Sequence, residues 1–256
     1  MLVTLDRCAG SRMLSLVCIL VTVSCPAAAP SQSRNGQHPD FSGVWGQYLE
    51  PGKSGFGMPR PMLPLTSEGE KRVAAYRALF GANPDSPGAH CVGSGMPESM
   101  MFSGGYPMEI IQRPDLMVMI YEAHTEVRHI YFGQRVLAPE DRAPDRNGYS
   151  AGHWQGDTLV VQTTALKEQE DEAYPHSDQA VIEERYHLAT EAKDAPVLID
   201  DWQLRDPVFY TMAVTGQKKW TLDPKGILLP YQCSEQAWLD YLDALKSGKS
   251  KAPAYP

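Results

Sequence analysis

The first candidates for catalysis are two glutamates that stand in rows of apolar residues at every second position of a predicted strand. Glu122 and Glu184 each take the next position in a row of apolar residues spaced two apart, in 116–123 and 181–188. Side chains two apart in a strand share a face, so both carboxylates are predicted to point into an apolar interior, where burial raises a carboxyl pKa and suits it to acid–base work. Arg128 is the expected partner. A buried ion pair that only closes the fold is the alternative.

Two histidines and one aspartate are further catalytic candidates. His176 and Asp178 lie in one short loop, where the carboxylate would orient the imidazole ring as a general base. His153 stands at the start of a strand. For both histidines, a turn-capping or packing role is the alternative.

Aromatic and methionine side chains are candidates for binding a flat apolar molecule, with Tyr121 and Tyr131 also able to donate hydrogen bonds to a developing oxyanion. The predicted substrate-binding residues are Tyr121, Tyr131, Trp154, Tyr186, Met100 and Met101.

The sequence contains none of the common motifs for metal binding, covalent hydrolase catalysis or nucleotide binding. There is no His-x-His pair, no His-Glu-x-x-His segment, no Gly-x-Ser-x-Gly elbow around Ser94 or Ser103, and no nucleotide-binding loop. We therefore expect no metal and no other cofactor.

The elements that would position these residues are mostly short β runs. The predicted strands are 108–112, 116–123, 126–132, 153–154, 158–164, 181–188, 197–204, 211–214, 219–222 and 227–232. In the turn 155–157, Gly156 is expected to take a positive φ. Because no helix long enough for a parallel crossover separates the runs, they predict a mainly β, antiparallel sheet of about nine strands, closed as a barrel or packed as a sandwich.

Two helices are expected beside the sheet. Ser67 and Glu70 form a capping-box pattern before a helix that Gly81 ends. Its apolar face would consist of Val73, Tyr76, Leu79 and Phe80. A second helix, 235–245, is predicted near the C-terminus. Between 82 and 107 lies a loop rich in Gly, Pro and Met.

Several motifs carry a family resemblance. Gly43-Val44-Trp45 looks like the start of a lipocalin or calycin barrel, and the runs PDFSGVW, MEIIQRP, GHWQGDTLVV and PHSDQAVIEERY resemble a widespread group of exported bacterial β-barrel proteins for which no activity is assigned. The likeness covers roughly 39–233 and implies a barrel fold and export. The chain departs from the group at Ala165-Leu166-Lys167 and within 197–210, where a changed specificity would arise.

The first thirty residues predict export. Basic residues, an apolar run at 13–25 and small residues up to Ala29 form a signal-peptide pattern, and about a dozen apolar residues are too few for a span that needs about 20. Retention of Cys25 as a lipid anchor is the alternative. The expected divisions are a signal peptide at 1–29, a flexible leader at 30–38, one barrel domain at 39–248 and a tail at 249–256.

Charge and cysteines limit the partners and the compartment. The formal net charge of −8 argues against nucleic acid or an anionic membrane surface as a partner. In an oxidising compartment Cys91 and Cys233 are predicted to form a disulfide, with two buried free thiols as the alternative.

Three functions remain open at this point. The first is an exported, cofactor-independent lyase or isomerase acting on a small apolar or aromatic molecule in a periplasmic or secreted setting. The second is a carrier with the same cavity. The third is a structural or interaction protein, which a filled barrel would favour.

Overall fold

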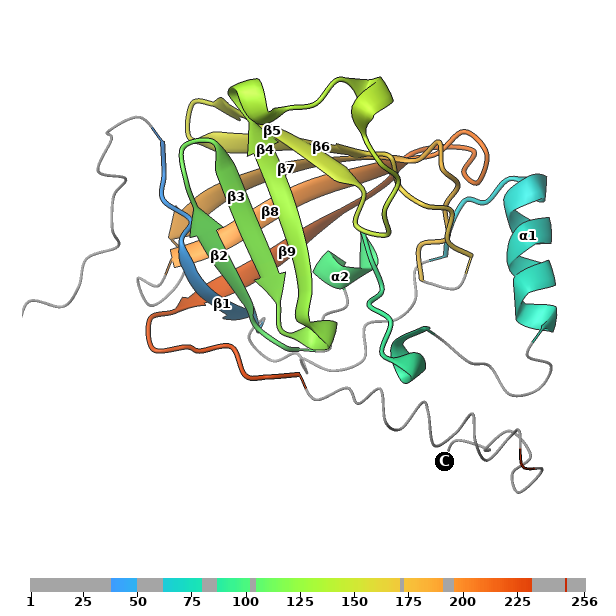
Figure 1. Ribbon diagram of the computed structural model, residues 1–256, viewed down its shortest axis with the longest axis horizontal. Helices are drawn as coiled ribbons and strands as arrows, with labels where there is room; N and C mark the ends of the chain where they lie inside the picture. Colours follow the sequence, from blue (N-terminus) through green and yellow to red (C-terminus); the bar gives the residue numbers. More distant parts are fainter. Residues whose placement is uncertain are drawn as a thin grey trace, which may run out of the picture. The chain divides into compact units, whose positions relative to one another are not determined.

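Nine strands close into a barrel in chain order, as the sequence predicted for a mainly β chain (Figure 1). The computed structural model describes residues 38–49, 62–79, 87–101, 105–170, 173–190, 196–231 and 247. The strands are β1 Gly43–Gln47, β2 Met108–Gln112, β3 Leu116–Tyr121, β4 Glu126–Phe132, β5 Tyr149–Gln155, β6 Thr158–Thr164, β7 Val181–Thr190, β8 Pro196–Arg205 and β9 Val214–Asp223. Pairing of β1 with both β2 and β9 closes the barrel.

One strand pair corrects the expectation of a purely antiparallel sheet. β4 and β5 run parallel, with Ile130 opposite Ser150, while the other neighbours are antiparallel. The connection between them contains the short 3-10 turns η3 Gly133–Arg135 and η4 Pro139–Asp141. This connection brings the chain back beside Ile130, in the second half of β4, without a long helix, so the absence of a helical crossover did not exclude a parallel pair.

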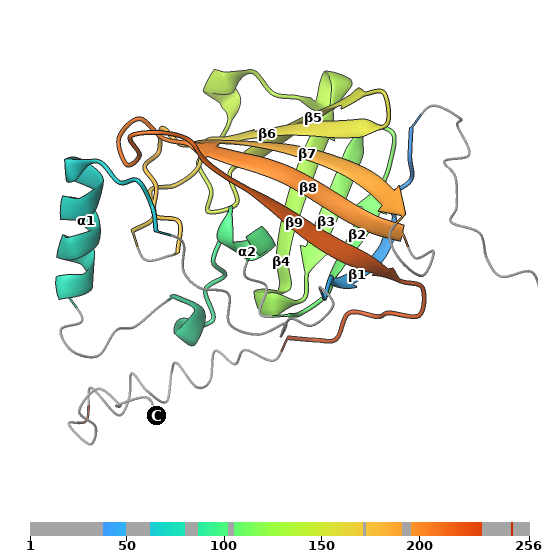
Figure 2. The ribbon, with the colours of Figure 1, turned by 180° about the vertical axis from the view of Figure 1, so that it is seen from behind.

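The last strand is longer than expected. β9 is continuous across Gly216, where the sequence predicted two short strands, and residues 227–231, predicted as a strand, form none. Gly216 lies under the indole of Trp202, where a Cβ would come within 2.6 Å of Cζ2. Figure 2 shows β7, β8 and β9 side by side in this wall of the barrel. The glycine therefore serves close packing inside a strand and does not end it.

A helix lies outside the barrel, with its first turn against the loop that follows β8. In α1 (Ser67–Ala78) the N-cap is Thr66, whose side chain accepts a hydrogen bond from the Gly69 amide, so the cap lies one residue before the predicted Ser67. Gly69 packs against the backbone of Phe209. Val73 is buried but Leu79 is exposed, which corrects the predicted apolar face.

A second short helix enters the barrel core from the Met-rich segment. All three of the residues Ser99, Met100 and Met101 in α2 (Glu98–Met101) are buried, and the 3-10 turn η1 Pro87–His90 precedes it. The segments 1–29, 30–37 and 249–256 and the predicted helix 235–245 lie outside the described residues. His38, expected in the leader, is described and stacks on Trp154 with ring centroids 4.7 Å apart.

Candidate active site

A buried arginine forms the centre of a polar group inside the barrel. Arg128 on β4 is 1% exposed and Glu184 on β7 is 0% exposed. Nη1 of Arg128 donates to Oε1 of Glu184 at 2.8 Å and to the Tyr186 hydroxyl at 3.4 Å, while Nη2 donates to Oε2 of Glu184 and, at 2.8 Å, to Thr163. Nε donates to Ser150 at 3.0 Å. The predicted pairing of Arg128 with an inward carboxylate is therefore confirmed for Glu184.

Within this Arg128 group, every N–H donor of the guanidinium is paired with an acceptor. A guanidinium has five N–H donors, and all five find acceptors here. Burial alone would lower the pKa of Arg128, but the charge and hydrogen bonds of Glu184 outweigh burial and hold it well above its usual value. A group so completely paired is better suited to holding strands together than to proton transfer, which favours the structural interpretation of this ion pair.

Glu122 does not join the group, which corrects the prediction that it meets Glu184. Its Oε2 accepts a 2.6 Å hydrogen bond from the Leu229 amide, just after β3 has ended. The buried face of β3 consists of Met117, Met119 and Tyr121, the face opposite to the one predicted. Because both faces of this strand are apolar, alternation alone did not indicate which one points inward.

The second interior carboxyl belongs to Asp200 on β8. It is 0% exposed, and its Oδ1 accepts a 3.1 Å hydrogen bond from the Arg185 amide, whereas no described residue hydrogen-bonds to Oδ2. Burial first, and then the negative charge of Glu184, raise the pKa of Asp200 well above its usual range, which favours the neutral form of the carboxyl. Asp200 lies two residues from Leu198 and Trp202 in a predicted strand, so the alternation that singled out Glu184 would also have found it.

Lys218 on β9 faces Asp200 from the neighbouring strand. The two residues are directly paired in the β8–β9 register, and Nζ of Lys218 donates to the Met101 carbonyl of α2 at 3.2 Å. Burial lowers the pKa of Lys218, which increases the fraction of neutral amine. Sequence reasoning missed this lysine because it divided β9 near Gly216 and assigned Lys218 to no strand.

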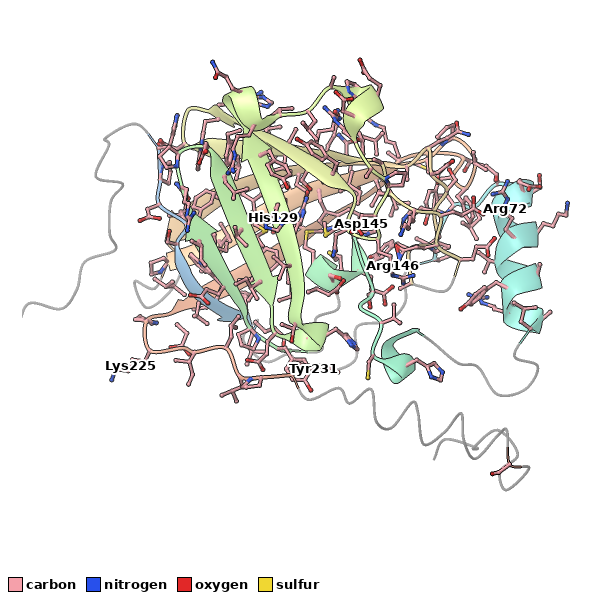
Figure 3. The ribbon with its side chains drawn as sticks, in the orientation of Figure 1. Arg72, His129, Asp145, Arg146, Lys225 and Tyr231 are labelled. Carbon is pink, nitrogen blue, oxygen red and sulfur yellow. The ribbon has the colours of Figure 1, made fainter. Side chains whose placement is uncertain are left out.

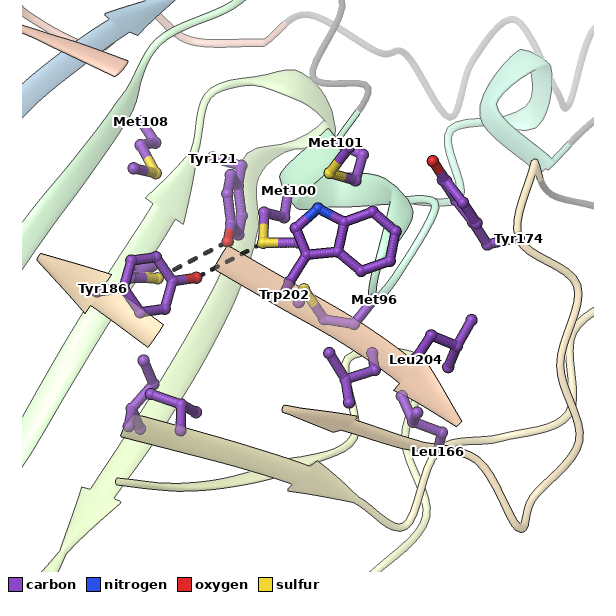
Figure 4. Packing of buried hydrophobic residues seen from close by; sticks show 14 of the residues in the cluster. Met96, Met100, Met101, Met108, Tyr121, Leu166, Tyr174, Tyr186, Trp202 and Leu204 are labelled. Atoms are coloured by element: carbon purple, nitrogen blue, oxygen red, sulfur yellow. Dashed lines mark hydrogen bonds between the residues drawn. The ribbon is translucent and has the colours of Figure 1, made fainter. Parts of the chain in front are cut away.

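Aromatic rings and methionines surround these groups. Figure 4 shows Met100 between Tyr121, Tyr186 and the indole of Trp202, with Met101 and Met96 beside that indole. The Tyr186 hydroxyl donates to Oε1 of Glu184 at 2.7 Å and also lies 3.6 Å from the Met100 sulfur. Four predicted substrate-binding residues, namely Tyr121, Tyr186, Met100 and Met101, thus lie in the buried core.

The other two predicted binding residues lie elsewhere. Tyr131 is on the outer face of β4, where it stacks on Tyr149 at 5.0 Å, because its neighbours in the strand, Ile130 and Phe132, take the buried positions. Trp154 is partly buried against Phe41, at a ring distance of 5.3 Å.

The histidine candidates do not reach the Arg128 group by any hydrogen bond among the described residues. His153 is exposed on β5 and contacts Gln155 at 3.0 Å, because β5 turns its other face inward. His176 is buried in a loop, with Nδ1 2.9 Å from the Tyr174 carbonyl. Asp178 is exposed and does not orient that ring through a hydrogen bond. The acid that holds this loop is Asp206, which accepts from the Ser177 hydroxyl at 2.9 Å.

Glu126 anchors the segment that carries α2. Its carboxylate accepts hydrogen bonds from the Gly95 amide at 3.1 Å, from Asn147 at 3.4 Å and from the Ser99 hydroxyl. Arg146, labelled near α2 in Figure 3, donates to the Gly93 carbonyl at 2.9 Å. Polar contacts therefore hold a short helix whose methionines fill the barrel end.

Replacing Glu126 by Ala is expected to lower the free energy of unfolding by about 1–3 kcal/mol, because partly buried donors around α2 lose their acceptor. Limited proteolysis should then cut more rapidly in the chain that flanks α2. Glu140→Ala, at an exposed position of η4, is the control and should change unfolding by less than about 0.5 kcal/mol. Equal behaviour of the two variants would contradict the anchoring role.

Cys91 is disulfide-bonded. Its partner lies outside the described residues, as does Cys233, so the Cys91–Cys233 pairing stays a prediction.

In comparisons with known proteins, no family model, curated protein or solved structure matches this chain. Within the described ranges, no group of three or more His, Cys, Asp or Glu side chains is arranged to hold a metal ion. In the same part of the chain, no helix is long and apolar enough to cross a membrane.

Proposed function

We propose that this protein is an exported, cofactor-independent isomerase or lyase that moves a proton on a small apolar or aromatic molecule inside the barrel. The observation that carries the proposal is the fully buried carboxyl of Asp200, to one oxygen of which no described residue hydrogen-bonds. Burial raises the pKa of this carboxyl, which favours its neutral form. Perturbed carboxyl groups in apolar surroundings are typical of acid–base sites. The disulfide at Cys91 supports export, since disulfides persist in oxidising compartments.

Asp200 and Lys218 take the acid and base roles in this proposal, in place of Glu122 and the histidines. In its neutral-amine form, which the lowered pKa makes more accessible, Lys218 accepts a proton from a carbon atom of the substrate, and Oδ2 of Asp200, in its protonated form, donates its proton to a second atom of the same molecule. The substrate is thereby isomerised with no net change in atoms. If the second atom belongs to a group that departs on protonation, the same two transfers give an elimination.

The direct pairing of Asp200 with Lys218 allows both side chains to regain their starting protonation states after the reaction. After the transfers, Lys218 is an ammonium ion and Asp200 a carboxylate, on neighbouring positions of β9 and β8. A proton passing from Nζ to Oδ2, directly or through one water, restores the neutral pair. Tyr186 stays neutral because burial, the largest cause, and the negative charge of Glu184 raise its pKa well above its usual value, and the charge that Asp200 gains after the transfers acts in the same direction.

A carrier of a small hydrophobic ligand is the second candidate. It is favoured by the completeness of the Arg128 group and by the wall of Met100, Met101, Trp202 and Trp220, which suits binding without chemistry.

Deuterium exchange separates the two functions. With 2-tetralone as a probe in D₂O, the enzyme is expected to accelerate exchange of the C–H protons beside the carbonyl, as followed by ¹H NMR. Asp200→Asn and Lys218→Met should each slow this exchange by roughly 10²–10⁴-fold because each removes one proton-transfer group. Probe affinity, measured by calorimetry, should change little.

The control is Lys219→Met, which alters the next residue of β9 on the outward-facing side of the strand and should leave exchange unchanged. Binding of the probe without any acceleration of exchange by the wild type would support the carrier instead.

A further inference from the structure

The indole N–H of Trp202 is a buried donor near Asp200. Trp202 is 4% exposed, and no described residue accepts a hydrogen bond from its Nε1. A Cβ on Gly216 would lie 2.9 Å from Nε1, so the ring lies flat against the backbone of β9. Figure 4 shows the indole nitrogen on the side of the ring that faces Met101. Because an indole N–H only donates, whatever satisfies it must supply an acceptor.

Oδ2 of Asp200 is a second buried polar atom to which no described residue hydrogen-bonds. Oδ1 already accepts a hydrogen bond from the Arg185 amide, so the proton of the neutral form would lie on Oδ2, which has no described hydrogen-bond partner and could donate from there. Asp200 and Trp202 stand two residues apart on the inward face of β8, roughly 7 Å apart along the strand. Their side chains therefore lie on the same face of the strand, as successive inward positions.

We infer that this pair is the subsite for a carbonyl oxygen, and that the substrate is a small aromatic or alicyclic ketone or aldehyde. A carbonyl oxygen has two lone pairs in one plane and accepts from two donors at once, which matches Trp202 Nε1–H and Asp200 Oδ2–H. The ring of such a molecule would lie among the methionines and aromatic residues of the core. This inference rests on the proposed function and names its substrate class.

The same donors would stabilise the charge that develops when Lys218 removes a proton from the carbon beside the carbonyl. The C–H electron pair moves into a new C=C bond, the C=O bond becomes C–O, and Asp200 gives its proton to that oxygen, so an enol forms and the atoms balance. A carboxylate ligand fits less well, because it would pair with a protonated Lys218 and leave no neutral base.

Binding of 2-tetralone and of tetralin, the same ring system without the carbonyl, tests the subsite. Trp202→Phe is expected to weaken binding of 2-tetralone about tenfold, since one buried hydrogen bond is lost, while tetralin affinity should change by no more than about twofold. Asp200→Leu should show the same selectivity. Asp200→Asn, which keeps an N–H donor at that place, should bind 2-tetralone nearly as well as the wild type.

The infrared C=O stretch of bound 2-tetralone gives a readout on the wild type that needs no variant. A stretch below its value in water is expected, and it should rise in Trp202→Phe. An unshifted stretch, or equal weakening of both probes by Trp202→Phe, overturns the carbonyl subsite, and a water molecule between the donors then becomes the explanation. Tetralin binding in that case leaves the proposed function standing. If neither probe binds to the wild type, the proposed function falls together with the inference.

Discussion

Arg128→Leu is expected to lower the free energy of unfolding by about 3–5 kcal/mol, as measured by urea denaturation. The substitution leaves the Glu184 carboxylate inside the barrel with the Tyr186 hydroxyl as its one remaining side-chain partner in the Arg128 group. An unpaired buried charge is far more costly than the absence of the whole pair. The double variant Arg128→Leu/Glu184→Leu should therefore be more stable than Arg128→Leu alone.

A matched control is present on α1. Arg72 donates to Glu68 at 2.8 Å and to Glu168 at 2.8 Å, but its side chain is 33% exposed. Arg72→Leu should cost no more than about 1 kcal/mol because solvent screens an exposed pair. If the two arginine variants were equally stable, or if the double variant were less stable than Arg128→Leu, the buried ion pair would not be the main determinant of stability at this site.

Asp200→Asn is expected to change how stability depends on pH. In the folded protein burial and the nearby Glu184 charge raise the pKa of Asp200, whereas in the unfolded chain an aspartate titrates near about 3.9. Between these two pKa values the folded state binds one more proton than the unfolded state. The contribution of Asp200 is therefore fully present below about pH 3.9 and is lost as pH rises, by about 1.4 kcal/mol per unit, until the folded pKa is reached.

The side-chain amide introduced by Asp200→Asn does not titrate, so the stability of this variant relative to the wild type should increase steadily from about pH 4 upward. Urea denaturation at several pH values between about 4 and 7 measures this difference. Asp201→Asn, at the exposed next position of β8, is the control and should show a difference within about 0.5 kcal/mol at each pH. A flat difference for Asp200→Asn would mean that Asp200 is ionised in the folded protein.

The local sequence pattern correctly predicted several strands and the contact between Arg128 and Glu184. The strands β2, β4 and β6 have the bounds that their apolar runs and turn residues predicted, and Gly156 takes the expected positive φ of 62°. Alternation also placed Arg128 and Glu184 on inward faces, because each stands among clearly apolar neighbours at every second position. A period of two is a property of the backbone, so it is present in the sequence before any long-range contact forms.

Other features depend on how the strands pair in the barrel and could not be predicted from the sequence. Both faces of β3 are apolar, so its inward face depends on its register with β2 and β4, and Glu122 was assigned to the wrong side. The parallel pairing of β4 with β5 likewise depends on where a connection returns the chain, which no residue pattern in it specifies.

The sequence by itself determined a β-rich chain with alternating strands, a Met-rich segment and the charged residues that those strands carry inward. Only the tertiary structure decided which carboxyls share one interior. It brought Asp200 opposite Lys218, laid Trp202 over Gly216, and left Oδ2 of Asp200 and the indole N–H of Trp202 without a described hydrogen-bond partner. The physical reason is that strand period is set by neighbouring peptide units, whereas register and closure are set by side chains far apart in the chain.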